Sequence, residues 1–330
     1  MGKNIEIELK LQITDRKIWC DILASAQLSA AAHPDSICHD TLEACYYDTP
    51  RHALRKAKLA YRIRREGGRW VATVKGGGSS AGGLHTRQEW NIVVEDCAAS
   101  VEPFLATPIG EKLRETVGDD KLELLFITRF ERRTLLIKTA DGSLVEAAAD
   151  RGEIIVDDQR EPIMELELEI KEGNAAALLD LGATLAERYP LLLEPRSKYY
   201  RGLLLAGIEQ QDDCIQVVPV AVEGGNCASL IKAITQVLNA KAYFIRQADQ
   251  EESLQRLQES LDYLLIFLGV LQRDMPELLY EDVKAGLFQF QQEVHNKQGA
   301  ALATVLGTGR YTALLLKMWA WAAKRTPEGD

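Results

Sequence analysis

The sequence lacks a long apolar segment and any paired cysteine motif. No apolar run among its 330 residues approaches the roughly 20 needed to cross a bilayer, which predicts a protein without a membrane span. The N-terminus alternates charged and apolar residues, so we expect no signal peptide. The six cysteines are scattered without a C-x-x-C pair, which predicts reduced thiols and a cytoplasmic location.

An excess of positive charge is also missing. The formal net charge is −10, which argues against non-specific binding to nucleic acid. It does not exclude an anionic ligand, because a local site can have the opposite sign. A bound divalent cation would balance part of the acidic excess.

The chain is long enough for two domains, and it contains no internal repeat. Its pattern changes from strand-like to helical near residue 206, after which Gly and Asp clusters are typical of a linker. We therefore expect a strand-rich domain over 1–205, a linker over 206–227 and a helical domain over 228–330.

Alternation of apolar and polar residues predicts eight strands in the first domain. The opening segment is the most regular, with Ile5, Ile7 and Leu9 on one face and Glu6 and Glu8 on the other. The expected strands cover 3–13, 42–48, 58–66, 69–76, 84–94, 122–138, 143–156 and 162–171. The expected helices of this part cover 15–31, 108–118 and 174–188. Turn signals separate several strands, at 66–68, in the Gly/Ser run 76–83 and at 141–142.

The polar faces of these strands carry charges of one sign each. Carboxylates occupy strands near both ends of the domain, and arginines and lysines occupy strands between them. On an open sheet such faces would simply be solvated. Closing eight antiparallel strands into a barrel would turn the charged faces inward and leave the apolar faces for an outer layer of helices. The sequence thus predicts a polar tunnel with an acidic and a basic side.

Such a tunnel suits a polyphosphate. Carboxylate oxygens bind Mg²⁺ or Mn²⁺, and guanidinium and ammonium groups hold phosphate oxygens. Catalysis would then consist of positioning and electrostatic stabilisation of the transferred phosphoryl group, with water as the nucleophile.

An ordered set of short motifs over about 1–205 strengthens this interpretation. The motifs are E-x-E-x-K at Glu6, Glu8 and Lys10, Y-x-D-T at 46–49, Tyr61-Arg62-Ile63-Arg64, Thr73-Val74-Lys75, Arg87-Gln88-Glu89, Phe130-Glu131-Arg132, Glu165-Leu166-Glu167-Leu168-Glu169 and Ser197-Lys198. In this order they resemble the CYTH superfamily, the triphosphate tunnel metalloenzymes. The resemblance implies an α+β fold, a closed eight-stranded antiparallel β-barrel with flanking helices, followed here by an all-α domain.

The resemblance also implies roles for individual residues. Lys10, Glu167 and Glu169 would be catalytic, and Glu89 would either orient a basic residue or serve as a metal ligand. Arg129 and Arg133 lie on the opposite face from Arg132 and are left outside the site. The implied ligands of Mg²⁺ or Mn²⁺ are Glu6, Glu8, Asp150, Glu165, Glu167 and Glu169. The implied phosphate-binding residues are Lys10, Arg62, Arg64, Lys75, Arg87, Arg132 and Lys198.

The C-terminal segment resembles a degenerate CHAD domain, the helical module that often follows CYTH. Such domains normally carry basic residues and histidines that bind polyphosphate. Residues 211–330 instead hold 11 lysines and arginines against 15 aspartates and glutamates, a net charge of −4, with His295 as the one histidine. We therefore expect this segment to serve packing or dimerisation.

The expected function is hydrolysis of tripolyphosphate to pyrophosphate and phosphate by an inorganic triphosphatase. Three alternatives stay open: a thiamine or nucleoside triphosphatase, a class IV-type adenylate cyclase, and a non-catalytic polyphosphate-binding protein. The expected partner is tripolyphosphate or a related triphosphate, without nucleic acid or membrane, and a homodimer is left open.

Overall fold

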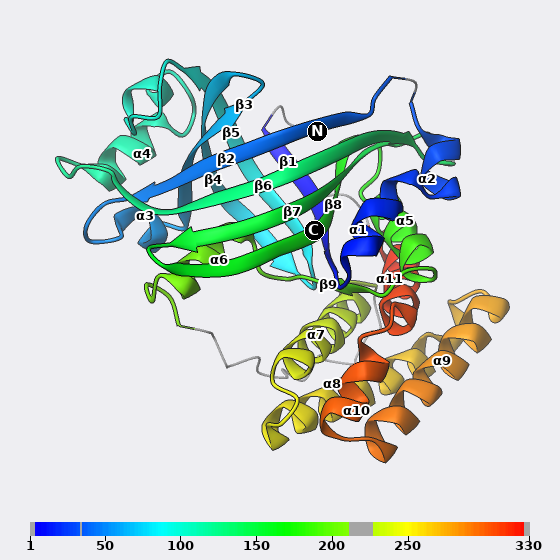
Figure 1. Ribbon diagram of the computed structural model, residues 1–330. Helices are drawn as coiled ribbons and strands as arrows, with labels where there is room; N and C mark the ends of the chain where they lie inside the picture. Colours follow the sequence, from blue (N-terminus) through cyan, green and yellow to red (C-terminus); the bar gives the residue numbers. More distant parts are fainter. Residues whose placement is uncertain (1–3, 34, 211–226, 327–330) are drawn as a thin grey trace.

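One antiparallel sheet that closes on itself dominates the first part of the chain (Figure 1). The computed structural model describes residues 4–33, 35–210 and 227–326. The strands of the closed sheet are β1 (Ile5–Ile13), β2 (Cys38–Asp48), β3 (Leu59–Glu66), β4 (Arg69–Ala81), β5 (Leu84–Val94), β6 (Glu123–Lys138), β7 (Leu144–Val156) and β8 (Gln159–Glu172).

The strand order explains how the barrel closes. Neighbours follow the order β5-β4-β3-β2-β6-β7-β8-β1, and β1 also pairs with β5. The first half of β1 pairs with β5, and its second half pairs on the same edge with the short strand β9 (Leu191–Leu193). The predicted closed eight-stranded antiparallel barrel is confirmed.

Period-two alternation sends charge inward and apolar side chains outward. Leu9 and Leu11 of β1 and Leu166 and Leu168 of β8 are fully buried in one hydrophobic cluster outside the barrel. The alternate residues Glu8, Lys10, Glu165 and Glu167 are buried on the inner side. Burying apolar area is the main source of folding free energy, so the outward face needs covering elements.

Helices provide that cover on two sides of the barrel. The large cluster takes in Trp19 and the helix after β8, whereas a second cluster places Tyr61 and Trp90 under the helix before β6. A third cluster joins apolar residues of β2, β6, β7 and β8 to the helix that follows β9, which contributes Leu203. These elements are α1 (Arg16–Asp21), η1 (Ile22–Ala24), α2 (Ala26–Ala31), α3 (Ala53–Lys56), η2 (Glu102–Phe104), α4 (Gly110–Val117), α5 (Ala176–Ala186) and α6 (Lys198–Leu205).

Two local predictions were wrong. The stretch 15–31 is not one helix, because a 3-10 turn separates α1 from α2. The Gly/Ser run 76–83 is not simply a turn, because β4 continues to Ala81 and the turn is confined to Gly82 and Gly83. The register between β4 and β5 shifts between Gly76 and Ser79, so the glycines form a β-bulge within a continuing strand.

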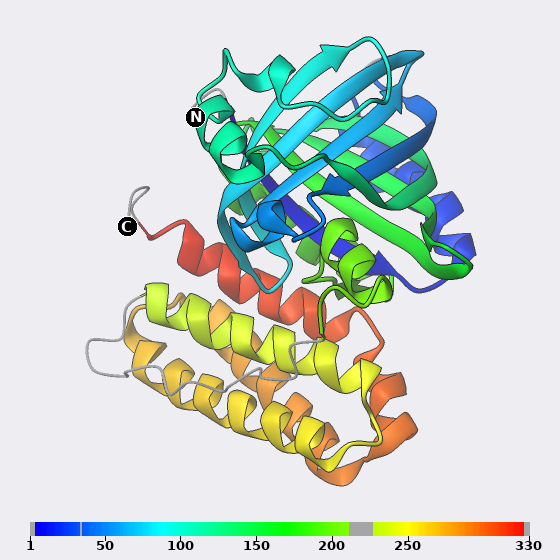
Figure 2. The same ribbon diagram turned by 90° about the vertical axis from the view of Figure 1, so that its left-hand side faces the viewer.

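The C-terminal region consists of helices packed below the barrel (Figure 2). Its last helix lies between the barrel and the other helices and packs chiefly on α5. The helices are α7 (Cys227–Arg246), α8 (Glu251–Val270), η3 (Leu271–Arg273), α9 (Glu277–Asn296), α10 (Gly299–Leu306) and α11 (Arg310–Ala323). The expected helical region after the barrel is confirmed, and most of the expected linker, 211–226, lies outside the described residues.

The barrel and the helical region share one core. The cluster outside the barrel that contains Leu9 and Leu168 continues into Leu238 of α7 and Trp319 of α11. No helix within the described ranges combines the length and apolarity that a bilayer crossing requires.

Candidate active site

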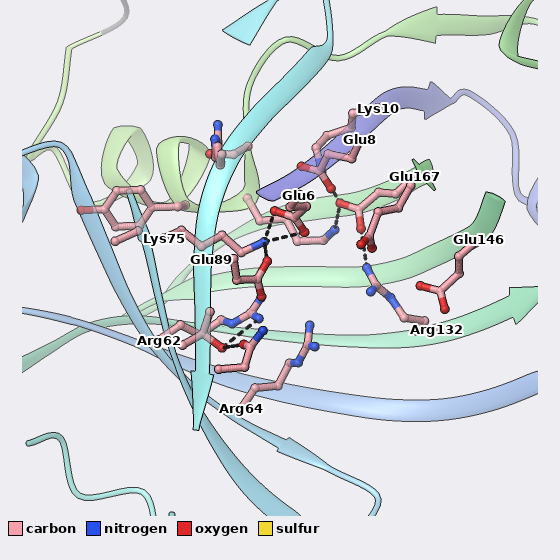
Figure 3. Close-up of a pocket in the computed structure, with 18 of the residues that line it drawn as sticks. Glu6, Glu8, Lys10, Arg62, Arg64, Lys75, Glu89, Arg132, Glu146 and Glu167 are labelled. Atoms are coloured by element: carbon pink, nitrogen blue, oxygen red, sulfur yellow. Dashed lines mark hydrogen bonds and ion pairs between the residues drawn. The ribbon is translucent and has the colours of Figure 1, made fainter. Parts of the chain in front are cut away.

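The barrel encloses a central cavity of about 280 Å³ to which all eight strands contribute side chains (Figure 3). Most of the residues predicted from the motifs line it. They are Glu6, Glu8, Lys10, Arg62, Arg64, Lys75, Arg87, Arg132, Glu167, Glu169 and Lys198. Asp150 and Glu165 lie behind this surface, with exposed fractions of 0% and 1%.

Strand β3 supplies a basic wall. An Arg62 guanidinium nitrogen donates to Thr73 Oγ1 at 3.3 Å, and Thr73 in turn donates to Asn91 at 2.7 Å, which follows the register of β3, β4 and β5. Arg64 pairs with Glu66. Burial, together with the neighbouring Arg62 and Arg132 cations, lowers the pKa of Arg64 to about 10. The wall therefore carries positive charge that its protein partners do not fully balance.

Lys75 joins the basic wall to the first strand (Figure 3). Its ammonium donates to Glu6 at 2.7 Å and lies 2.9 Å from Glu89. Burial raises the pKa of Glu6 to about 7, since Lys75 only partly offsets it and Glu8 and Glu89 add to it. Burial alone would raise the pKa of Glu89. The Lys75 and Arg62 cations outweigh burial and hold the pKa of that carboxyl below its usual range. The contact matches the orienting partner expected of Glu89.

A row of three carboxylates crosses β7, β8 and β1. Glu169 lies directly opposite Glu146 on one neighbouring strand and Glu8 on the other. Like charges in cross-strand positions destabilise a sheet, and Lys171 relieves part of this by pairing with Glu169 at 2.8 Å and Glu146 at 3.3 Å. Burial nevertheless raises the pKa of Glu169. The row therefore favours a further cation.

A second acidic cluster already contains a cation. Ligand oxygens of Asp150, Glu165 and Glu167 lie within 4.8 Å of one another, a spacing that could hold a metal ion. The Lys198 ammonium at the start of α6, however, donates to all three, at 2.7 Å to Asp150 and 3.0 Å to Glu167 and in a shorter contact to Glu165. Lys10 pairs with Glu167 from the cavity side. These carboxylates thus anchor two lysines in the described structure.

Glu167 is the most heavily compensated group of the site. Burial disfavours its charged form, but Lys10, Lys198 and Arg132 outweigh burial and hold its pKa well below the usual range. Arg132 makes a bidentate contact with Asp150, both bonds being 2.7 Å long, and also reaches Glu167. Such charge-assisted contacts fix both partners, so Glu167 holds three cations in place at the cavity wall.

The motifs assigned no role to Glu146 and Lys171, two charged residues that line the lumen. Both lie on the inward face of their strands together with predicted site residues. Glu146 shares that face of β7 with Asp150, and Lys171 shares that face of β8 with Glu169. Strand periodicity alone could therefore have found them. Arg129 and Arg133 point outward, where Arg129 pairs with Glu43 and Arg133 donates to the Cys20 carbonyl.

The inner carboxylates fit a hard divalent cation. Glu6, Glu8, Glu146 and Glu169 all line the cavity and offer only oxygen ligands. The raised pKa values of Glu6 and Glu169 mark positions where the protein's own cations leave negative charge poorly stabilised. Mg²⁺ or Mn²⁺ would stabilise that charge.

Comparison with known proteins identifies the barrel. Residues 4–203 match the family model of the CYTH domain. An inorganic triphosphatase of Haemophilus influenzae is 33% identical over 206 residues, which are 61% of this chain and 54% of that protein. The chain thus spans about half the length of this curated relative.

Solved structures of low sequence identity also align with the barrel part of the chain. A putative adenylyl cyclase from Hippeastrum, HpAC1, described as having a dominant triphosphatase activity, is 17% identical, with 59% of this chain and 95% of that chain covered and a TM-score of 0.44. A putative adenylate cyclase from Bacillus halodurans is 16% identical, with 61% and 98% covered and a TM-score of 0.41.

Proposed function

This chain belongs to the CYTH domain family, and from that premise we propose that it is a metal-dependent inorganic triphosphatase. The reaction is hydrolysis of tripolyphosphate to pyrophosphate and phosphate. The similarity to an inorganic triphosphatase at 33% identity supports this choice of substrate over an organic triphosphate.

One observation carries the proposal: two unbalanced charge surfaces of opposite sign line a single cavity. The pKa of Arg64 is lowered beside Arg62 and Arg132, so this wall favours an added anion, and the pKa of Glu169 is raised in its row with Glu8 and Glu146, so that row favours an added cation. A complex of a polyphosphate with a divalent metal ion supplies both. A ligand of one sign alone would leave one surface uncompensated.

The proposed roles follow from position. Arg62, Arg64, Arg87, Lys75 and Arg132 bind phosphate oxygens. Lys10 and Lys198, held by the acidic cluster behind the cavity, bind phosphate from the other side. Glu6, Glu8 and Glu169 hold Mg²⁺ or Mn²⁺, which when bound would neutralise phosphate charge and lower the pKa of a water molecule.

Glu167 and Glu169 have different proposed roles. Glu169 also positions the attacking water at the cavity wall, where burial keeps its carboxylate basic. Glu167 acts chiefly by fixing Lys10 and Arg132 at the phosphates. Asp150 and Glu165 were expected among the metal ligands, and we propose that they support the site through Lys198 instead.

For the whole chain we propose a CYTH domain over 1–205 and a CHAD-like domain over 228–330 that serves packing or dimerisation. The acidic composition of the second part and its shared core with the barrel support this role. We further propose that the protein works in the cytoplasm.

The first experiment compares substrates. Phosphate release should be measured with tripolyphosphate, ATP and thiamine triphosphate in the presence of Mg²⁺ or Mn²⁺. Tripolyphosphate should give the highest kcat/KM. Equal or faster turnover of an organic triphosphate would contradict the proposal, formation of cyclic AMP from ATP would favour a cyclase, and binding of tripolyphosphate without turnover would favour a non-catalytic protein.

The second experiment tests the metal. We expect Glu169→Gln to abolish metal-dependent turnover and to weaken Mn²⁺ binding measured by calorimetry, because it removes a charged oxygen ligand from the row. Glu153→Gln is the matched control, since Glu153 lies on the outer face of β7 and is 42% exposed. Full activity and unchanged Mn²⁺ affinity in Glu169→Gln would exclude this ligand assignment.

A further inference from the structure

The central cavity shares lining residues with two further cavities, one toward each end of β3. The inward residues of this strand are Ala60, Arg62, Arg64 and Glu66, in that order. Ala60 also lines a cavity beside α6, and Arg64 and Glu66 line a cavity at the other end. The six-residue step from Ala60 to Glu66 covers about 20 Å. The row of cavities along β3 therefore extends beyond the central cavity.

The cavity beside α6, which we call the glycine mouth, is strongly basic. It has a volume of about 280 Å³, and its charged lining residues are Arg55, Lys58, Lys75 and Arg87, without a carboxylate. Arg55 is paired with Glu209, and Lys75 with Glu6 and Glu89. Within the described ranges, neither Lys58 nor Arg87 has a carboxylate at ion-pair distance.

The surroundings of Arg87 keep its charge unbalanced. Its guanidinium contacts Nδ1 of His85 at 3.2 Å. This contact is with a ring nitrogen and not with a carboxylate. The positive charge of Arg87 is therefore available to a ligand that enters through the mouth.

The backbone of the mouth is also suited to an anion. Gly77 and Gly78 form the bulge of β4, with φ values of +66° and +89°. Residues in a bulge are left out of the regular ladder, and successive N–H groups in such turns form concave anion sites. A Cβ on Gly78 would lie 1.9 Å from the Thr86 carbonyl oxygen, so only glycine fits.

The opposite cavity has a different charge. It is lined by the carboxylates Asp40, Glu66 and Glu146 and by two arginines, Arg64 and Arg132. Both arginines are engaged, Arg64 with Glu66 and Arg132 with Asp150. A polyanion longer than the central cavity meets three carboxylates and two already paired arginines at this end, but meets Lys58 and Arg87 without a carboxylate partner in the described ranges at the glycine mouth.

We propose that the glycine mouth is a subsite for the fourth and later phosphates of a linear polyphosphate whose terminal triphosphate unit fills the central cavity. This rests on the proposed function and extends its substrate class. Lys58, Arg87 and the Gly77–Gly78 backbone bind the added phosphates. Chains longer than tripolyphosphate therefore enter from the α6 end and not from the acidic end.

The test compares tripolyphosphate with tetrapolyphosphate. Lys58→Asn removes the cation, and asparagine tolerates the left-handed backbone at this position, where φ is +57°. Lys56→Asn is the matched control, because Lys56 lies on the neighbouring helix α3 and is exposed but lines neither cavity. Ser79→Glu is a second variant that places negative charge in the mouth.

We expect Lys58→Asn to lower the kcat/KM ratio of tetrapolyphosphate to tripolyphosphate about three- to tenfold, as expected for loss of one partly exposed ion pair. Ser79→Glu should lower the ratio at least as much, and Lys56→Asn should leave it unchanged. If both mouth variants keep the wild-type ratio while tripolyphosphate is hydrolysed, the subsite is excluded.

Two further outcomes keep this proposal separate from the proposed function. If Lys58→Asn reduces ATP turnover while the tetrapolyphosphate ratio is unchanged, the mouth receives an organic group and the subsite is excluded. If tripolyphosphate is not hydrolysed at all, the proposed function fails, and calorimetric Kd values of the two polyphosphates for wild type and both variants decide the subsite. If wild type binds tetrapolyphosphate no more tightly than tripolyphosphate, the proposed subsite is excluded.

Discussion

The barrel lumen and the helical region both bury lysines, but they treat the charge in opposite ways. Lys198 in the lumen is 7% exposed and contacts three carboxylates, and burial is outweighed by these neighbours so that its pKa is raised. Lys241 in α7 is 2% exposed and donates to Thr312 Oγ1 at 2.9 Å, and burial lowers its pKa to about 7.

This contrast distinguishes the lumen, which is suited to binding ions, from the helical region, which forms a packed apolar core. In the lumen, carboxylates and cations from several strands compensate one another, and the remaining charge is arranged for a ligand. In the helical region Lys241 lies among apolar helices of the shared core, and no carboxylate of the described residues pairs with it. Charge there is a cost to folding, which supports a packing role for this region.

The largest effect is expected where the lumen network has most partners. Glu167→Gln leaves Lys10, Lys198 and Arg132 with less compensation. We expect kcat/KM for tripolyphosphate to fall by about 10²- to 10³-fold, measured by phosphate release, while Glu153→Gln on the outer face keeps wild-type activity. A loss below tenfold would mean that the three cations hold their positions without Glu167.

Removing a lysine from the lumen should destabilise the protein. Lys198→Met leaves Asp150 and Glu165 buried without this cation. We expect the free energy of unfolding at pH 7 to fall by about 3–5 kcal/mol, measured by urea titration. An unchanged free energy would show that Arg132 and Arg201 alone compensate the two carboxylates.

Removing the lysine from the helical region should do the reverse. The unfolded chain carries a proton on Lys241 that the folded protein lacks between about pH 7 and the ordinary pKa of 10.5. The free energy of unfolding therefore rises with pH through this window, since the unfolded state binds more protons. Lys241→Met should stabilise by about 1–4 kcal/mol at or below pH 7.

This stabilisation should shrink toward pH 10, because the free-energy cost of releasing the Lys241 proton on folding falls as the pH approaches 10.5. Urea titrations of wild type and Lys241→Met across pH 6 to 10 measure the difference. If the variant is less stable than wild type at every pH, the bond to Thr312 outweighs the cost of burial and the contrast with Lys198 fails.

The smallest effect is expected at the boundary between the two regions. A Cβ at Gly82 would lie 3.2 Å from Trp319 and 3.3 Å from Leu238, at a φ of +52°. Gly67 has a φ of +51° and nothing within 4 Å, so Gly67→Ala measures the backbone cost alone. We expect Gly82→Ala to cost about 1 kcal/mol more than Gly67→Ala, by thermal unfolding. Equal costs would mean that the helices adjust freely around the turn.

Much of the barrel follows from the sequence because strand alternation is local. Alternation along the first strand alone distinguishes the inward residues Glu6, Glu8 and Lys10 from the outward residues Leu9 and Leu11. The same parity separated Arg132 from Arg129 and Arg133. Motif order then predicted eleven of the residues that line the cavity.

Other features of the structure could not be predicted from local sequence patterns. The Gly/Ser run 76–83 has the composition of a turn, and only pairing with β5 keeps it in a strand with a bulge. Helix α6 was not predicted, although the Ser197 side chain accepts from Tyr200 N–H as an N-cap. Without α6, nothing in the sequence places Lys198 between Asp150 and Glu165.

The sequence by itself determined which residues are charged, which faces they share and, through the ordered motifs, the family. Only the tertiary structure decided which carboxylates are compensated. Glu165 and Glu169 lie on the same face of β8, yet Glu165 is bound by Lys198 and Arg201, whereas Glu169 faces Glu8 and Glu146 and pairs with Lys171. The reason is that electrostatic compensation depends on distances of a few ångströms between segments far apart in the chain.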